Sequence, residues 1–407
     1  MIMNTDNLDV KKAMTQLSST STQDRIHSLD LLRGFALLGI LIMNIISFSN
    51  IGYLNPTIGA GLEGYNTYVH GFGYLFADTR FMSIFSILFG AGVVLFADNA
   101  IKKNKNVWKY HYRRMFLLLL FGMIHAYCIW MGDILVAYAV CGSFVFFWRN
   151  WKLRSLATLG SILFLVPVLF TLMTYYFTPA DQLQEIFSFW TPTQDEIDKE
   201  TAAYLGGFFE QNTERIPGAI EIQTFVFIMS IVWRVSSMMI LGMILYRTGV
   251  LTAEKPNGLY KKMVLISLPA GLIIASVGLY LSYQNEWDGV WCMNIGENYK
   301  YFASILVALG YIGAIMLWSK TDWWSGLQLR LRAVGRLAFT NYILMSVICT
   351  FIFYGHGLGL FGTFDRLQQL GVVVVIWVLL LIMSPLILQR YRQGPLEWLW
   401  RKLTYLN

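Results

Sequence analysis

Charged residues are scarce in this chain of 407 residues, at 14% of the sequence against the roughly one quarter that is typical of soluble domains. Cysteine is scarcer: Cys128, Cys141, Cys292 and Cys349 are scattered without a CxxC spacing, which argues against a disulfide framework or a zinc site. A P-loop, HExxH, kinase motifs and a serine nucleophile elbow are all absent. Their absence argues against soluble hydrolase and ATP-driven mechanisms.

Hydrophobic residues are abundant instead, at 56% of the chain, and they gather in ten apolar stretches. About 20 apolar residues cross the hydrocarbon core as a helix, and backbone groups cannot stay unpaired in lipid. The sequence therefore predicts an all-α, polytopic integral membrane bundle of about ten transmembrane helices. The expected spans are 31–49, 75–97, 115–131, 134–149, 155–177, 223–246, 262–283, 300–318, 335–355 and 370–389.

The basic residues fall almost entirely into alternate gaps between these stretches. Gaps such as 102–114 and 320–336 are rich in Lys and Arg, whereas 178–222, the largest gap of the other set, is acidic. Because positive loops stay in the cytoplasm, both termini are expected inside. The net charge of +7 is explained by these topology signals, so nucleic acid is not an expected partner.

Four parts follow from this pattern. Residues 1–28 form a polar cytoplasmic tail, which lacks the apolar core of a signal peptide. Residues 29–177 hold the first five helices, and 178–222 is interpreted as an extracytoplasmic lid or re-entrant cap. Residues 223–407 hold the other five helices and a basic, Trp-rich tail that is expected to lie flat at the inner interface.

The first expected helix carries three polar residues. Asp30 and Arg33 stand three apart, so they can pair on one helical face. Asn44 follows Arg33 by eleven residues, close to three whole turns, and so lies on the same face toward the outer leaflet. A structural explanation remains open, in which Arg33 reaches to the interface and Asn44 bonds a neighbouring helix.

This helix resembles the opening helix of the YeiB-like bacterial membrane proteins, named mostly as domain of unknown function 418. The resemblance runs over nearly the whole chain and includes RFMSIFSILFGAG, HAYCIWMGDILVAYAVCG, GRLAFTNYILMS and GPLEWLWRKLTY, at 80–92, 125–142, 335–346 and 394–405. It implies a multi-pass protein of the bacterial cytoplasmic membrane.

The family is distantly similar to a transmembrane acyltransferase superfamily, whose members open with a similar Arg-Gly helix. Its polysaccharide O-acyltransferases carry His eleven residues after the Arg. The lysosomal enzyme that acetylates heparan glucosamine carries Asn there, as this chain does at Asn44. If the resemblance extends to acyl transfer, the catalytic histidine must come from elsewhere.

His125 is the leading candidate, because an ionisable group inside a span normally faces a bundle interior or a wet cavity. Asp133 follows in a short turn and could hold its tautomer and raise its basicity. The alternative is that Asp133 only caps the next helix. His70 resembles by position the loop histidine of the heparan enzyme, and His111 is expected on the cytoplasmic surface.

Further polar residues are candidate substrate or donor contacts. Arg234 lies in mid-span, where a lone cation needs a counter-charge such as Asp78 or an anionic headgroup; Arg80 lies close to Asp78 in the sequence. Asn341 and Tyr342 lie in the ninth span, where packing through hydrogen bonds is also a sufficient explanation.

Two functions remain open. In the first, an acyltransferase takes an acyl group from acetyl-CoA or another acyl-CoA in the cytoplasm. It passes the group to an extracytoplasmic envelope glycan or lipid, with His125 as base and Asn44 bonding the oxyanion. In the second, a transporter or flippase binds an anionic solute or lipid without chemistry. The lipid bilayer is the expected partner, no metal is expected, and the oligomeric state is open, a homodimer included.

Overall fold

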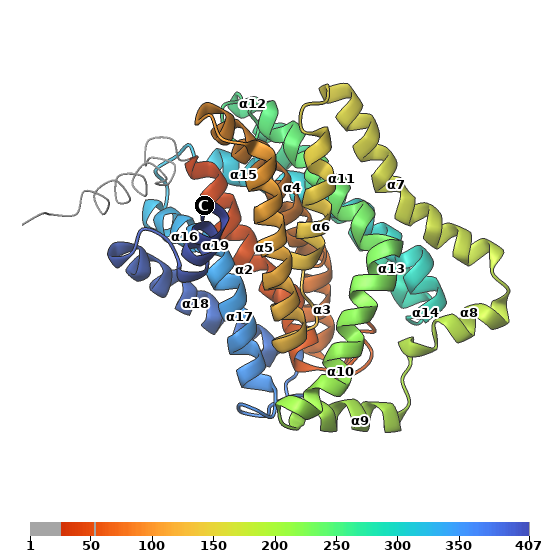
Figure 1. The fold of residues 1–407 in the computed structure, drawn as a ribbon. Coiled ribbons are helices and arrows are strands. Elements are labelled where there is room, and N and C mark those ends of the chain that lie inside the picture. Colours follow the sequence, from red (N-terminus) through yellow and green to blue (C-terminus); the bar gives the residue numbers. More distant parts are fainter. Residues whose placement is uncertain (1–25, 53, 407) are drawn as a thin grey trace, which may run out of the picture.

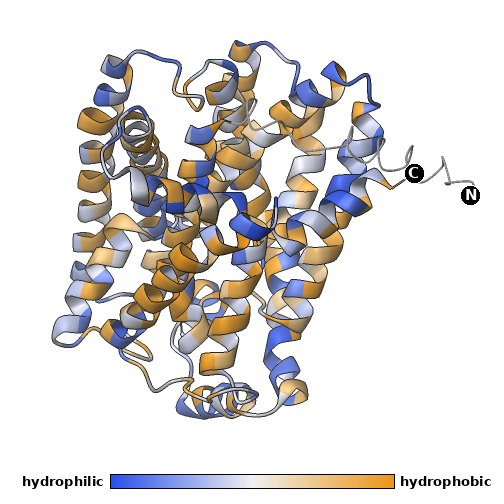
Figure 2. Cartoon of the chain, turned by 90° about the vertical axis from the view of Figure 1, so that its left-hand side faces the viewer, coloured by the Kyte–Doolittle hydropathy of each residue, from blue (hydrophilic) through white to orange (hydrophobic). Residues whose placement is uncertain are grey.

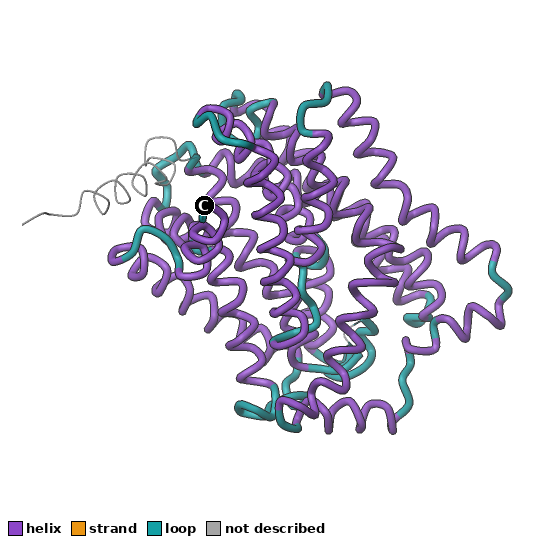
Figure 3. The backbone as a smooth tube through the Cα atoms, viewed as in Figure 1, coloured by secondary structure: helices purple, strands orange, loops and turns teal. Residues whose placement is uncertain are grey.

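The structure is a computed structural model that describes residues 26–52 and 54–406. Within these ranges the chain is helical and has no β-strand, as Figure 3 shows by the purple helices and teal connections. The predicted all-α polytopic bundle is confirmed. The helices of its first half are α2 (His27–Ser49), α3 (Tyr65–Phe76), α4 (Arg80–Lys102), α5 (Val107–Cys128), α6 (Leu135–Val145) with the 3-10 turn η2 (Phe146–Trp148), and α7 (Leu153–Phe177).

The second half begins after a chain of short helices. These are α8 (Ala180–Ile186), η3 (Ser188–Trp190), α9 (Gln194–Leu205) and α10 (Phe208–Glu221). The long elements that follow are η4 (Ile222–Ile231) with α11 (Val232–Arg247), α12 (Asn257–Lys262) with η5 (Met263–Ser267) and α13 (Leu268–Gln284), and α14 (Gly289–Trp291) with η6 (Cys292–Gly296) and α15 (Glu297–Trp318). The last are α16 (Ser325–Arg336), α17 (Ala338–Phe353), α18 (Arg366–Arg390) and α19 (Pro395–Tyr405). In η4, η5 and η6 the helix is wound in the wider π form.

Every expected span falls on one helix or on consecutive helices, and the second, 75–97, crosses the break between α3 and α4. Seven are long and apolar enough to cross a membrane by length and composition, and α16 with α17 passes the same test as a pair bent by 84°. The fourth expected span, α6 with η2, is a shorter apolar helix. The third, α5, is a helix of 22 residues that carries Arg113 and Arg114 near its start.

The basic gaps gather at one end of the bundle. In Figure 1 the turns after α4 and η2 and the short helix α12 lie at the top, whereas α9 and the start of α10 lie at the bottom. Figure 2 shows hydrophobic residues along the middle of the helices, with hydrophilic residues mostly toward the two ends. This arrangement agrees with the alternation of charge along the sequence, from which the basic end is predicted to face the cytoplasm.

Glycines bring two helix pairs into backbone contact across the two halves of the chain. A Cβ on Gly90 of α4 would lie 1.9 Å from Met239 O of α11, and one on Gly242 would lie 1.9 Å from Ile87 O. The crossing of α2 and α16 is built in the same way by Gly34 and Gly335. Small residues allow such close approach in membrane bundles, where apolar burial does not drive helices together. Both crossings tie the first half to the second, so the buried core is shared.

The acidic segment 178–222 packs against the helix ends opposite the basic end of the bundle. Tyr204 of α9 lies against Tyr354 and Phe361, with ring centroids 4.8 and 4.7 Å apart. Arg215 of α10 donates from Nε to the carbonyl of Tyr127 at 3.1 Å, at the end of α5. The segment therefore covers the turn between α5 and α6, where the first candidate residues lie.

Candidate functional site

His125 is the centre of a chain of three buried polar side chains. Its Nδ1 lies 2.8 Å from Asp133 Oδ1, and its Nε2 lies 2.9 Å from Ser346 Oγ. His125 comes from α5, Asp133 from the turn before α6, and Ser346 from α17. Because a carboxylate oxygen only accepts hydrogen bonds, the contact with Asp133 requires the imidazole tautomer that carries its proton on Nδ1. With that tautomer, Nε2 can accept from the Ser346 hydroxyl, whose alternative acceptor is Tyr342 O at 3.3 Å, and the pair has the arrangement of a general base beside its proton donor.

Asp133 does both things that its position allows. Its Oδ2 accepts from the backbone N–H of Val136 at 2.7 Å and so caps the start of α6, while Oδ1 faces the imidazole. Gly122 of α5 makes this possible, because a Cβ there would lie 2.7 Å from Val136 N and 3.0 Å from Asp133 Oδ2. The capping and orienting roles are therefore compatible.

Ser346 is the residue that sequence reasoning missed. Serine is ordinary in spanning helices, where it bonds backbone carbonyls, and Ser346 Oγ also lies 3.3 Å from Tyr342 O. Its contact with His125 joins residues 221 positions apart, which no local pattern reveals. The one available signal is the spacing of Tyr342 and Ser346, which places both on one face of α17.

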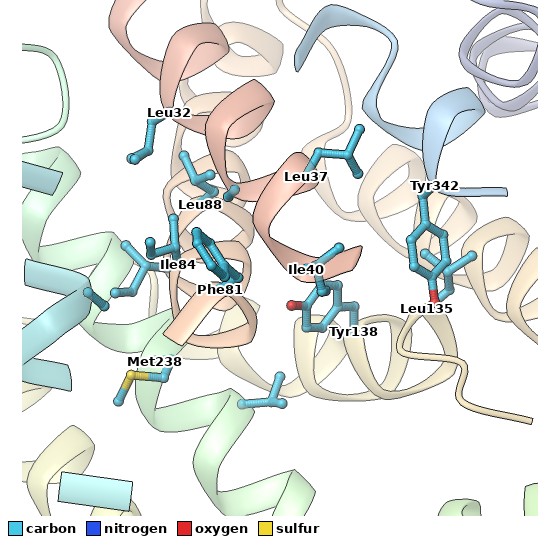
Figure 4. Close-up of a cluster of buried hydrophobic side chains, with 14 of the residues drawn as sticks. Leu32, Leu37, Ile40, Phe81, Ile84, Leu88, Leu135, Tyr138, Met238 and Tyr342 are labelled. Carbon is cyan, nitrogen blue, oxygen red and sulfur yellow. The ribbon is translucent and has the colours of Figure 1, made fainter. Parts of the chain in front are cut away.

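A cavity of about 340 Å³ extends from the basic end of the bundle toward the hydrogen-bonded residues Asp133, His125 and Ser346. Arg33, Arg114 and Arg336 line it there, together with Glu397. Deeper in, the walls are apolar, and Figure 4 shows part of them: Ile40, Leu88, Leu135, Tyr138 and Tyr342.

Tyr342 stands between this cavity and the imidazole. Its ring lines the cavity, and its centroid lies 5.1 Å from that of His125. The cavity is thus cationic at its mouth and apolar along its length, and it ends one aromatic ring away from His125.

His111 is a correction to the sequence analysis, which expected it on the surface. It is buried in α5, stacks on Phe146 with centroids 3.9 Å apart and bonds Gly142 O at 3.1 Å. It belongs to the cavity wall. The charged residues next to it in the sequence concealed this, although one of them, Arg114, lines the same cavity.

The residues of α2 are placed as follows. Asp30 and Arg33 pair at 2.9 Å, as their spacing predicted, and Arg33 reaches the cavity. Asn44 is partly exposed, does not line this cavity and forms no hydrogen bond with His125 or Asp133. The predicted convergence of Asn44 on the same cavity is therefore absent from this arrangement of the described residues.

α2 approaches the imidazole through aromatic rings instead. Phe48, one turn after Asn44, stacks on Trp130 with centroids 4.1 Å apart. The Trp130 ring lies edge-on to His125 at 6.3 Å. The C-terminal end of α2 is thus separated from the His125 ring by the Trp130 indole.

Two other candidates lie elsewhere. His70 is on α3, edge-on to Trp287 at 5.2 Å, and α3 packs on α13 and α18 rather than on α5. Asn341 donates to Val334 O at 3.2 Å and to Ser384 Oγ at 3.0 Å, so its amide joins helices and does not face the cavity.

Arg80 and Arg234 belong to a second polar cluster, between α4, α11 and α15. Arg234 donates to Ser304 Oγ at 3.1 Å. Asp78, a suggested counter-charge for Arg234, is instead paired with Lys300 at 3.2 Å. Lys300 was not singled out from the sequence, because it lies at the start of a span where a lysine reads as an interfacial residue.

These features define a class: a polytopic α-helical membrane protein with an Asp–His–Ser chain buried beside an amphipathic cavity. Within that class, the chain belongs to the YeiB-like DUF418 family. A family model described as "Protein of unknown function (DUF418)" matches residues 245–407.

Relatives match nearly end to end. The chain is 31% identical over 388 residues to the uncharacterised protein YeiB of Escherichia coli strain K12, covering 94% of this chain and 96% of that protein. It is 31% identical over 415 residues to the uncharacterised protein YxaH of Bacillus subtilis strain 168, covering 97% and 98%. It is 30% identical over 383 residues to an uncharacterised 39.9 kDa protein of Bacillus acidopullulyticus, covering 94% of each.

Proposed function

We propose that this protein is a membrane acyltransferase of the bacterial cytoplasmic membrane. It takes an acyl group from a cytoplasmic thioester such as acetyl-CoA and delivers it to a hydroxyl or amine of an extracytoplasmic envelope glycan or lipid. The observation that carries the proposal is the hydrogen-bonded chain from Asp133 through His125 to Ser346, next to a cavity with a cationic mouth.

The cavity suits the reactive arm of an acyl-CoA. Phosphates of the donor would rest on Arg33, Arg114 and Arg336, because guanidinium groups bind phosphate oxygens well. The acyl thioester would extend along the apolar walls to Tyr342. A change in the Tyr342 rotamer would then open the way to His125, whose ring it covers.

The chemistry needs two steps at one serine. The imidazole Nε2 takes the proton of Ser346 as Oγ attacks the thioester carbonyl; the C–S bond breaks, and the thiolate leaves with that proton. Asp133 stabilises the imidazolium that forms between these events. An acceptor hydroxyl or amine then gives its proton to Nε2 and attacks the serine ester, and the released Oγ recovers that proton.

Radiolabelled acetyl-CoA tests this mechanism. The purified full-length protein should acquire covalent label that maps to Ser346, and the label should chase into envelope material when inverted vesicles are supplied. His125→Ala and Ser346→Ala should each abolish labelling. Ser282→Ala is the matched control, because Ser282 is a buried serine of α13 that donates to the helix carbonyl of Gly278 at 3.0 Å.

If neither the wild type nor Ser282→Ala takes up label or transfers acetyl groups, the enzyme proposal fails. The second candidate, transport of an anionic solute without chemistry, would then replace it. Its support is the group of cations formed by buried Arg80 and Arg234 and partly exposed Lys300, and its test is solute flux into liposomes that contain the protein.

A further inference from the structure

Two arginines meet in the interior of the bundle, away from His125. Arg80 of α4 is fully buried, and Arg234 of α11 is 6% exposed. Arg234 precedes Arg247 at the basic end of α11 by thirteen residues, which at 1.5 Å per residue places it about 20 Å into the bundle. Its Nη2 lies 3.1 Å from Ser304 Oγ and 3.4 Å from Thr79 O, next to the start of α4.

Their charges are not balanced by the side chains around them. The two carboxylates of this region, Asp78 and Glu297, are both engaged by Lys300, at 3.2 and 2.6 Å. Among the described residues, no carboxylate lies within ion-pair distance of either arginine. Three cations therefore face two anions, which leaves one positive charge in excess. An unpaired cation inside the membrane costs much free energy unless a counter-ion neutralises its charge.

The unused hydrogen-bond donors of Arg80 point to the missing partner. Its Nη1 is engaged by Asp78 O and by Thr79 Oγ1, whereas Nε and Nη2 are buried without any hydrogen-bond partner. The N–H groups of Nε and Nη2 form one edge of the planar guanidinium and point in parallel. That edge matches two oxygens of a carboxylate or a phosphoryl group.

The backbone is irregular on all three helices of this cluster. The helix is interrupted between α3 and α4, where Thr79 adopts a left-handed φ of 64°. The π-helical stretch η4 ends at Ile231, just before Arg234, and η6 ends at Gly296, just before Glu297. π-helical turns recur at functional sites, and interrupted membrane helices surround binding sites in transporters.

We infer that Arg80, Arg234 and Lys300 form a binding site for one monoanionic oxyanion, a phosphoryl or carboxylate group. The ligand would lie on the Nε–Nη2 edge of Arg80, and its charge would neutralise the excess. It would reach this edge past Asp78 and Lys300, whose side chains are 35% and 21% exposed.

This site is separate from the proposed acyl transfer. Among the described residues, none of its three cations contacts the Asp133–His125–Ser346 chain, and none of them lines the cavity. The inference therefore stands or falls on its own test.

Thermal unfolding of the full-length protein measures the binding. In detergent, inorganic phosphate should raise the melting temperature by several degrees over chloride of equal ionic strength. In nanodiscs, phosphatidylglycerol should do so over phosphatidylcholine. A response to phosphate identifies a free oxyanion as ligand, and a response to phosphatidylglycerol alone identifies a lipid headgroup.

The variants assign the response to the cluster. Arg80→Gln and Arg234→Gln should abolish it, and Arg80→Lys should weaken the apparent affinity about tenfold, because lysine keeps the charge and loses the two-pronged edge. Arg366→Gln is the matched control: Arg366 is buried and donates to Gly61 O at 2.9 Å and Pro56 O at 2.8 Å.

Three outcomes would overturn the inference. They are a wild type that responds to neither phosphate nor phosphatidylglycerol, a response that survives in both glutamine variants, and a response that Arg366→Gln removes equally. Should a glutamine variant not fold, Arg80→Lys decides, and wild-type affinity in that variant would count against the site.

Discussion

At the scale of single residues, Asp133 holds two hydrogen bonds that one substitution can separate. Asparagine keeps an oxygen that accepts from Val136 N–H and so retains the cap of α6, but it cannot hold the Nδ1–H tautomer as a carboxylate does. Asp133→Asn should therefore lower the rate of acyl transfer by about a hundredfold to ten-thousandfold and leave the melting temperature within a few degrees.

The measurement is the kcat of acetyl transfer beside the unfolding curve. If the loss of rate were explained by the loss of folded protein, the role of Asp133 would be only to cap α6. Full activity in Asp133→Asn would remove the carboxylate from the mechanism.

Glu200 of the acidic segment 178–222 makes the stability of the protein depend on pH. Burial, and secondly the charge of Glu214, raise the pKa of Glu200 to about 7 from its ordinary 4.5. Between these values the folded protein binds a proton that the unfolded chain has released, so stability falls as pH rises from about 4.5 to about 7.

Glu200→Gln lacks this titration and should lose less melting temperature between pH 5 and pH 8 than the wild type. If the melting temperatures of the two proteins changed with pH in parallel, Glu200 would have the same pKa in the folded and unfolded states, and the prediction would be wrong. Glu196 is a suitable control position, since it caps its own helix through Thr193 and is exposed.

At the scale of elements, the α4–α11 crossing depends on the absence of a side chain at Gly90. A methyl group there would lie 1.9 Å from Met239 O, whereas at Gly92, two residues on, nothing lies within 4 Å. Gly90→Ala should push the helices apart and destabilise the protein by about 1–3 kcal/mol or more, while Gly92→Ala should be neutral or slightly stabilising.

Melting temperature in one detergent compares the two variants directly. Equal melting temperatures of Gly90→Ala and Gly92→Ala would mean that α4 and α11 are not in such close contact at Gly90. The same substitution at Gly34 examines the α2–α16 crossing, where the barrier is Leu331 O at 1.9 Å.

At the scale of the whole molecule, the orientation is a prediction from charge alone. In a chain without its native cysteines, Asp198→Cys should react with an impermeant thiol reagent on intact cells, because position 198 is exposed in the acidic segment. Asn104→Cys, exposed in a basic turn, should react only after the membrane is opened. The reverse pattern would invert the topology.

Much of the architecture follows from the sequence itself. Lipid imposes the same demand on every span separately, so hydropathy located the helices, and loop charge sorted their ends. Short-range geometry was also readable: Asp30 and Arg33 pair within one turn, and His125 meets Asp133 across one short connection. The turn is short enough that the two could hardly lie far apart.

Only the tertiary structure decided which distant side chains complete these groups. Ser346 contacts His125 from 221 residues away. Lys300 pairs with Asp78 from 222 residues away, a carboxylate that the sequence suggested as one of two possible counter-charges for Arg234. The reason is that helices in lipid associate where their surfaces are complementary in shape. Gly90, Gly242, Gly34 and Gly335 set which backbones touch, and those contacts set which polar faces meet.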